Sequence, residues 1–197
     1  MQRAHDGAAV PCAARPRRPG ARRRSAARGR QVERVLRRLV ADDAPALTAL
    51  RVRNRSYLAP WEPDADDPER WYTVDGVRSW ITDGADRFAI VEDGELAGMA
   101  SITGVVRGGI QSAMVSYFVD EKRAGRGLGT AAVRELVAVA FGQLALHRVE
   151  AGTAVANVAS HRVLERNGFT RVGLLRRHLL LQGEWVDHFL WERLADH

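Results

Sequence analysis

The chain has 197 residues, enough for one medium-sized domain with a tail but not for two full domains. Its formal charge of +6 is unevenly spread: residues 1–30 hold nine arginines and one acid, Asp6, which leaves −2 for residues 31–197. The basic character therefore belongs to the first segment and does not indicate a basic face on the folded body. The single cysteine, Cys12, excludes an intrachain disulfide, a zinc site built on paired cysteines and an iron–sulfur centre.

Residues 1–30 consist mostly of Ala, Arg, Pro and Gly and have little to bury, which predicts a disordered tail. A start site assigned too far upstream and a nucleic-acid-binding arm are the alternative interpretations of this segment. No apolar stretch follows its paired arginines, so no export signal is predicted, and the longest apolar run, residues 136–141, is too short to span a membrane. We therefore expect a soluble cytoplasmic protein, monomeric or homodimeric, with one folded domain over residues 31–197.

The first half of that domain alternates between strands and short helices. Predicted strands lie at residues 32–40, 88–91, 96–105 and 112–119, and predicted helices run from Asp42 to about residue 53 and, in short pieces, through 54–84. Asp93-Gly94 supplies the positive φ of a tight hairpin turn. Residues 112–119 are apolar on both faces, which predicts a central strand.

The second half contains a glycine-rich loop and the helix that follows it. Apolar residues at helical spacing after Gly129 predict this helix, and Gly142 is expected to end it. Further predicted elements are a strand over 147–155, a helix capped by Asn157 and stopped at Gly168, and a closing hairpin over 174–181 and 184–193.

The loop at residues 125–129 lies between a strand and a helix, an arrangement that binds anions through free backbone N–H groups. A nucleoside-triphosphate loop is excluded, because the only lysine, Lys122, precedes the glycines. A dinucleotide fold is a stronger alternative: residues 127–132 read G-x-G-x-x-A, and Glu150 stands near the expected ribose-binding acid. The five residues between strand and glycines, together with the flanking hairpins, count against it.

In this order of elements the chain resembles the GNAT superfamily of acetyl-CoA-dependent N-acetyltransferases. The family's pyrophosphate loop, [QR]-x-x-G-x-[GA], aligns with residues 124–129, although Ala124 replaces the usual Gln or Arg. The neighbouring Arg123 is the candidate to compensate for the missing side chain. Several short runs are similar to the ribosomal-protein-alanine (RimJ/RimL-like) branch: residues 58–62, 146–150, 157–160, 167–169 and 185–188. The resemblance implies an α/β (α+β) fold with a mixed, mostly antiparallel sheet of about seven strands, flanked by about four helices and split between the fourth and fifth strands.

The resemblance also implies a set of site residues. Backbone groups of Phe118 and Val119 would hold the pantetheine arm of acetyl-CoA. The pyrophosphate would lie against Arg123, Ala124, Gly125, Arg126, Gly127, Leu128, Gly129 and Thr130. Asn157 matches a cofactor-contacting asparagine but is equally explained as a helix cap, and Ser160 matches a general acid but is also explained as a first-turn serine.

Cys12 lies outside the folded body, so we expect direct attack of an amine on the thioester, with no acyl-enzyme. An N-terminal α-amine, with a pKa of about 7.8, is roughly a tenth neutral at pH 7 and needs only a weak base. Glu150 is the first candidate for that base, ahead of His147, Glu184 and Asp187. The aromatic residues Tyr57, Trp61, Trp71, Trp80 and Trp185 are candidates for the walls of the substrate groove or for the core.

The leading hypothesis is an acetyltransferase acting on a protein N-terminus, with a ribosomal protein as the candidate acceptor and small amines such as polyamines or antibiotics as a variant. A nicotinamide-dependent oxidoreductase and a non-catalytic acyl-CoA-binding or nucleic-acid-binding protein remain as alternatives. No metal ligand set is predicted.

Overall fold

The computed structural model describes residues 34–195, so the predicted tail at residues 1–30 and Cys12 lie outside the described range. Its centre is a seven-stranded sheet in the order β1-β2-β3-β4-β5-β7-β6. The strands are β1 Leu36–Arg38, β2 Asp86–Glu92, β3 Glu95–Val106, β4 Ser112–Val119, β5 Arg148–Ala154, β6 Thr170–Leu181 and β7 Glu184–Leu194. The described strands pair antiparallel except for β4 and β5, which confirms the expected mixed sheet.

Five α-helices flank the sheet: α1 Ala44–Arg53, α2 Arg55–Leu58, α3 Val74–Ile81, α4 Leu128–Ala138 and α5 Val158–Arg166. The proline-containing region predicted as short helical pieces consists of α2, α3 and the 3₁₀ turns Ala59–Trp61 and Pro68–Tyr72. Among the described residues, no helix has the length and apolar character needed to cross a membrane.

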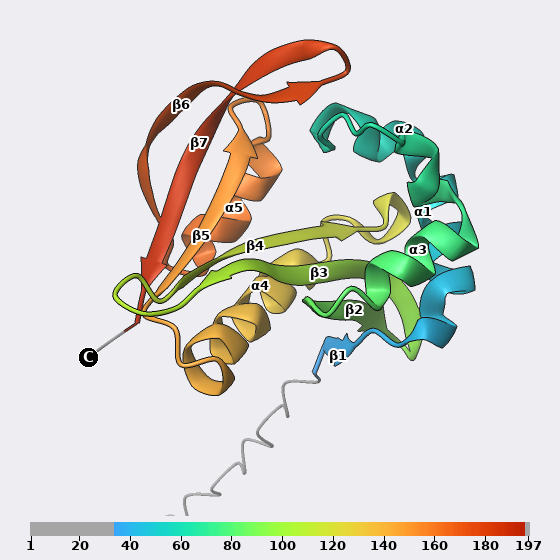
Figure 1. Ribbon diagram of the computed structural model, residues 1–197, viewed down its shortest axis with the longest axis horizontal. Coiled ribbons are helices and arrows are strands. Elements are labelled where there is room, and N and C mark those ends of the chain that lie inside the picture. Colours follow the sequence, from blue (N-terminus) through green and yellow to red (C-terminus); the bar gives the residue numbers. More distant parts are fainter. Residues whose placement is uncertain (1–33, 196–197) are drawn as a thin grey trace, which may run out of the picture. The chain divides into compact units, whose positions relative to one another are not determined.

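Two hydrophobic clusters lie on opposite faces of the sheet, each between the sheet and a different set of the helices drawn in Figure 1. The larger one joins the sheet to α4 and α5 and includes the fully buried Leu136 and Leu164. The smaller one joins the other face to α1 and α3 and includes Leu47, Leu50 and Val77. Because side chains alternate along β4, this strand contributes to both clusters, with Tyr117 against the first and Phe118 against the second.

The sheet opens between its two parallel strands. β4 and β5 pair only from Ser112 with Arg148 to Met114 with Glu150, and the remaining residues of both strands diverge. Figure 1 shows β5 and β7 turning away from the end of β4. The opening leaves the last five residues of β4 without a neighbouring strand on that side, which confirms the split implied by the resemblance.

Two predicted turns and one predicted helix end can be compared with the structure. Asp93 and Gly94, and likewise Gln182 and Gly183, have positive φ values of 53°, 80°, 51° and 81°, as two-residue hairpin turns require. Gly142, in contrast, does not end the helix. It lies inside a π turn, Val139–Gln143, that continues α4, and the left-handed residue comes later, at Ala145 with φ 48°.

A loop contact bridges the open end of the split. The carboxylate of Asp64 accepts the N–H groups of Gln182 and Gly183, both at 2.8 Å, and the N–H of Asp64 donates to the carbonyl of Leu180 at 2.9 Å. This pairing ties the segment after α2 to the β6–β7 turn. The contact thus connects the helical segment after α2 with the β6–β7 hairpin, which pairs with β5 through β7.

Candidate active site

The glycine-rich loop leads from β4 into α4 and exposes the helix N-terminus. Gly125 and Gly127 have φ values of 79° and 88°, a left-handed conformation that favours glycine. The first backbone hydrogen bond of the helix runs from Ala131 N–H to Gly127 O at 3.0 Å. The N–H groups of the three residues before Ala131 therefore remain outside the helical hydrogen-bond pattern and carry the positive end of the helix dipole.

These N–H groups belong to a cavity of about 330 Å³, called the loop cavity here, between β4, α4 and α5. A Cβ placed on Gly125 or Gly127 would meet no heavy atom within 4 Å, so open space lies next to the loop. Eleven of the thirteen predicted site residues line this cavity: Phe118, Val119, Arg123, Ala124, Gly125, Gly127, Leu128, Gly129, Thr130, Asn157 and Ser160. Residues that are far apart in the sequence thus meet at one site.

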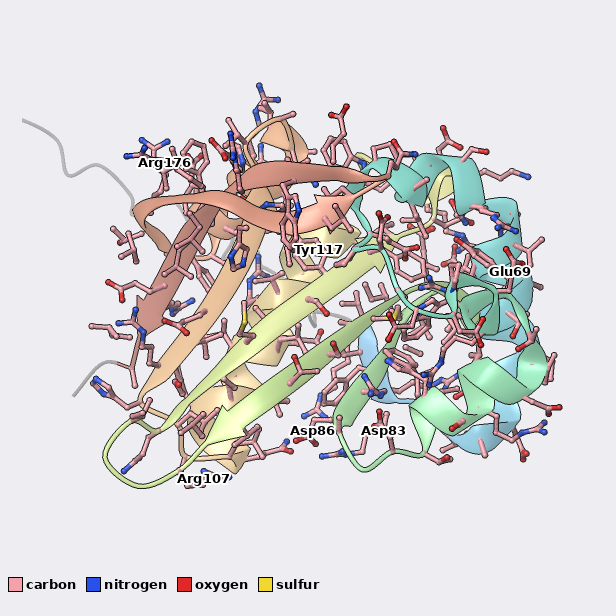
Figure 2. All side chains as sticks on the ribbon, turned by 45° about the horizontal axis from the view of Figure 1, so that its top comes forward. Glu69, Asp83, Asp86, Arg107, Tyr117 and Arg176 are labelled. Atoms are coloured by element: carbon pink, nitrogen blue, oxygen red, sulfur yellow. The ribbon has the colours of Figure 1, made fainter. Side chains whose placement is uncertain are left out.

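A pair of hydroxyl groups lies in the wall of the loop cavity. Tyr117 Oη and Ser160 Oγ are 2.9 Å apart, a hydrogen bond in which either group can donate. Figure 2 marks Tyr117 near the end of β4. Burial raises the pKa of Tyr117 to about 12, against the opposing effect of its hydrogen bond to Ser160. The phenol is therefore protonated at neutral pH, so both hydroxyl groups of the pair keep their protons and are uncharged.

Asn157 orients the serine of this pair. Its side-chain oxygen accepts the backbone N–H of Ser160 at 3.1 Å, which makes it the N-cap of α5. The capping interpretation of Asn157 is thus correct. The same residue also lines the loop cavity, so its side chain lies within reach of a bound molecule.

The backbone of β4 alternates between β3 and the split. The N–H of Asp120 donates to Ala97 O of β3 at 2.8 Å, so the backbone of Phe118, two residues earlier, also faces β3. Val119 and Tyr117 consequently direct their backbone polar groups towards the split. The expected backbone contact is therefore available at Val119 and also at Tyr117, whereas Phe118 contributes its side chain.

A second cavity of about 420 Å³, the tryptophan cavity, lies on the other face of β4 and is lined by Trp61, Trp71 and Trp80. The buried Arg51 donates through Nη2 to both carboxylate oxygens of Glu62, at 2.8 and 3.0 Å, and its guanidinium lies 5.0 Å from the Trp71 ring centre. The two cavities share four residues: Leu58, Trp61, Tyr117 and Phe118. They therefore meet at the end of β4.

The two arginines expected beside the pyrophosphate are held by glutamates. Arg123 donates to Glu92 Oε2 at 3.1 Å and to Glu95 Oε2 at 2.6 Å. Arg126 donates to Glu92 Oε2 at 3.3 Å and does not line the loop cavity. The anion-binding capacity of the loop thus rests on backbone N–H groups, while these arginines brace the loop against the β2–β3 turn.

The structure does not bring the expected base to either cavity. Glu150 lies on β5 at the last paired position before the split, and its carboxylate accepts Arg148 Nε at 2.7 Å. The second-rank candidates His147, Glu184 and Asp187 also line neither cavity, and Asp187 accepts the backbone N–H of Arg177. Of the predicted aromatic residues, Tyr57 lines the loop cavity and three tryptophans line the tryptophan cavity. Trp185 is 62% exposed and lines neither cavity.

Sequence reasoning missed three features of the site. The Tyr117 hydroxyl and the Arg51–Glu62 pair depend on side-chain direction and on contacts between distant segments. Arg162 and Arg166 also line the loop cavity, and their i, i+4 spacing after Asn157 was the available signal. Among residues 34–195, no cluster of His, Cys, Asp and Glu has the arrangement of a metal site.

The chain is similar to known acetyltransferases. The chain is 37% identical over 164 residues to "Probable N-acetyltransferase YjcK" of Bacillus subtilis, and the match covers 78% of this chain and 89% of the relative. It is 30% identical over 167 residues to the [ribosomal protein uS5]-alanine N-acetyltransferase of Escherichia coli. This match covers 80% of this chain and 86% of the relative. Mycobacterium smegmatis RimJ, solved in complex with CoA-disulfide, superposes with a TM-score of 0.76 at 33% identity, covering 81% of each chain. Residues 34–170 match the acetyltransferase (GNAT) domain, and the chain therefore belongs to the GNAT family of acetyltransferases.

Proposed function

We propose that this acetyltransferase transfers the acetyl group of acetyl-CoA directly to the N-terminal α-amine of a protein, and that the acceptor is a ribosomal protein. The observation that carries the proposal is the meeting of two cavities at Tyr117 and Phe118. One cavity has an anion-binding wall and the other is lined by aromatic side chains. A donor and an acceptor that enter from opposite faces of β4 would thus meet at its end.

The loop cavity suits the diphosphate and the pantetheine arm of acetyl-CoA. The N–H groups at the start of α4 would bind the diphosphate, with Gly125 and Gly127 giving it close access to the backbone. The outward-facing backbone of Val119 would pair with the amides of the arm in the manner of an added strand. When bound, acetyl-CoA supplies an activated acetyl thioester.

The Tyr117–Ser160 pair would manage the proton at the leaving sulfur. Ser160 Oγ lines the cavity and would donate its proton to the leaving sulfur, and the amine nitrogen, which loses a proton as the amide forms, would supply the proton that restores Ser160. Tyr117 would hold Ser160 in place through the 2.9 Å hydrogen bond. A phenol with a pKa near 12 keeps its own proton at neutral pH, so Tyr117 positions and supports Ser160. No described cysteine lies in the loop cavity, which fits direct transfer to the amine.

An α-amine is the acceptor that best suits this arrangement. About a tenth of such amines are neutral at pH 7, compared with less than one in a thousand lysine side chains, so little help from a base is needed. Glu150, the base expected from the sequence, lies outside both cavities and is paired with Arg148. The similarity to the uS5-alanine N-acetyltransferase supports a ribosomal protein as the acceptor.

The test is acetylation of defined peptides with labelled acetyl-CoA, followed by mass spectrometry. Peptides with a free N-terminal alanine should be modified at the α-amine, whereas matched peptides with a blocked N-terminus and an internal lysine should not. A ribosomal protein should lose its free N-terminus in cells that carry the enzyme and retain it in cells without the enzyme. Modification of polyamines or lysine side chains in preference to every N-terminal peptide would contradict the proposal.

A further inference from the structure

Two arginines in the wall of the loop cavity have no assigned task. Arg162 and Arg166 lie one turn apart on α5, and both line this cavity. Both are exposed, and neither side chain forms an ion pair or hydrogen bond with another residue of the described range 34–195. Arg123, the other arginine lining the cavity, is occupied by Glu92 and Glu95. The cavity therefore has a pair of uncompensated guanidinium groups on one side.

The contacts of α5 show which end of the cavity these arginines occupy. Near the start of the helix, Ser160 bonds Tyr117 at the end of β4. Beyond the end of the helix, Asn167 Nδ2 donates to Thr130 O in the first turn of α4 at 3.1 Å. The helix thus runs from the proposed acetyl end of the cavity to its phosphate end. Arg166 is the last residue of the helix, and it lines the same cavity as Gly129 and Thr130 of the first turn of α4.

The chemistry of acetyl-CoA places a third phosphate near this position. Its ribose carries the diphosphate on the 5′ oxygen and a single phosphate on the 3′ oxygen, so the two groups lie one sugar ring apart. With the diphosphate at the start of α4 and the pantetheine arm directed towards Tyr117, the nucleotide extends towards the other end of the cavity. The C-terminal half of α5 forms the wall there.

We propose that Arg162 and Arg166 bind the 3′-phosphate of acetyl-CoA and make the enzyme select acetyl-CoA over its 3′-dephospho form. This inference rests on the proposed use of acetyl-CoA. Guanidinium groups suit the task because their planar donors match phosphate oxygens and their charge persists at any physiological pH. The loop supplies backbone donors for the diphosphate, while α5 supplies full charges for the more highly charged monoester.

Isothermal titration calorimetry on the full chain tests this assignment with two ligands, acetyl-CoA and 3′-dephospho-acetyl-CoA. The wild-type protein should bind acetyl-CoA about a hundredfold more tightly, with about tenfold from each arginine. Arg162→Gln and Arg166→Gln should each remove about tenfold of this preference, and the double variant should bind both ligands alike. Affinity for the dephospho ligand should stay within about twofold throughout.

Arg176→Gln is the matched control, because Arg176 is an exposed arginine on β6 that lines neither cavity (Figure 2). It removes the same charge and should leave the preference unchanged. Equal wild-type affinities for both ligands, or an unchanged preference in the double variant, would overturn the inference and leave the use of acetyl-CoA intact. If the wild-type protein bound neither ligand, the proposed function would fall first and the inference with it.

Discussion

The two cavities that meet at the end of β4 are built in different ways. The loop cavity depends on the main chain, with left-handed glycines, the first turn of α4 and the outward-facing backbone of β4. The tryptophan cavity depends on side chains from distant segments, held by the Arg51–Glu62 pair and a cluster of indole rings. A site made of backbone groups is marked in the sequence by the residues that permit its conformation. A site made of side chains has no such mark.

The largest expected effect comes from breaking the main-chain site. Gly127→Glu places a side chain at φ 88° and a negative charge next to the exposed N–H groups, where a phosphate would bind. We expect acetyl-CoA affinity to fall by more than about a hundredfold, because strain and charge repulsion act together. Calorimetry of the folded variant measures the loss.

Gly84→Glu is a close control for this variant. Gly84 has φ 90° and open space around it, and it lies between α3 and β2, outside both cavities. The substitution imposes similar strain and the same charge, so it should lower the unfolding temperature and leave acetyl-CoA affinity unchanged. Equal losses of affinity in the two variants would show that the loop is not the phosphate site.

The same contrast explains what the sequence could predict. Asp93-Gly94, the glycines at 125–129 and the Asn157 cap impose their conformation locally, so the turns, the loop and the start of α5 followed from short patterns. Local patterns also predicted the strands, and the resemblance implied the split between two of them. Gly142 is an exception, because the π turn keeps the chain helical where glycine alone suggests an end.

Side-chain partners could not be predicted in this way. Glu150 was placed on the correct strand, but its partner Arg148 lies two residues away on the same face, and the pairing register with β4 decides where that face points. Glu62 and Arg51 are separated by a helix end and a turn, and only tertiary packing brings them together. Trp61 and Trp185 are both tryptophans beside polar residues, yet one lines both cavities and the other lies exposed on the hairpin.

The hydroxyl pair offers a chemical test of the loop cavity. Ser160→Ala keeps the capped backbone N–H but removes the proposed proton donor, so turnover should fall by about a hundredfold while acetyl-CoA affinity stays within about twofold. Tyr117→Phe removes only the supporting hydroxyl and should lower turnover by about tenfold. Steady-state kinetics with calorimetry separates these effects. A normal rate in the alanine variant would remove Ser160 from the mechanism.

The tryptophan cavity offers a test on the acceptor side of the reaction. Glu62→Gln leaves the buried Arg51 with an uncharged partner, so a protonated acceptor amine would meet net positive charge in the cavity wall. We expect KM for an N-terminal peptide to rise by about tenfold, with acetyl-CoA affinity unchanged. Glu69→Gln is the control, because Glu69 is exposed, pairs with an exposed arginine and lines neither cavity (Figure 2). A change in acetyl-CoA affinity alone would reverse the proposed roles of the two cavities.

The smallest expected effect concerns the residue that joins the two regions. Asp120 follows β4 and is buried, accepting hydrogen bonds from Arg53 at 2.7 Å and Asn54 at 3.0 Å at the end of α1. Asn54 in turn accepts the N–H of Glu121, so the start of the loop is fixed to the helix beside the tryptophan cavity. Burial by itself would raise the pKa of Asp120, but the hydrogen bonds from Arg53 and Asn54 outweigh it and lower the pKa below its ordinary value.

A lowered pKa in the folded state gives stability that is present above the unfolded-state value, about 3.9, and is lost as the pH falls through the folded-state value. Asp120→Asn should therefore reduce the free energy of unfolding by about 2 kcal/mol at pH 7, and the difference from wild type should shrink below about pH 4. Urea unfolding of both proteins at several pH values measures this. Because Asp120 anchors the loop, the same variant should also weaken acetyl-CoA binding slightly, by about two- to threefold. A stability difference that stays constant down to pH 3 would show that the charge of Asp120 does not join the side-chain region to the main-chain region.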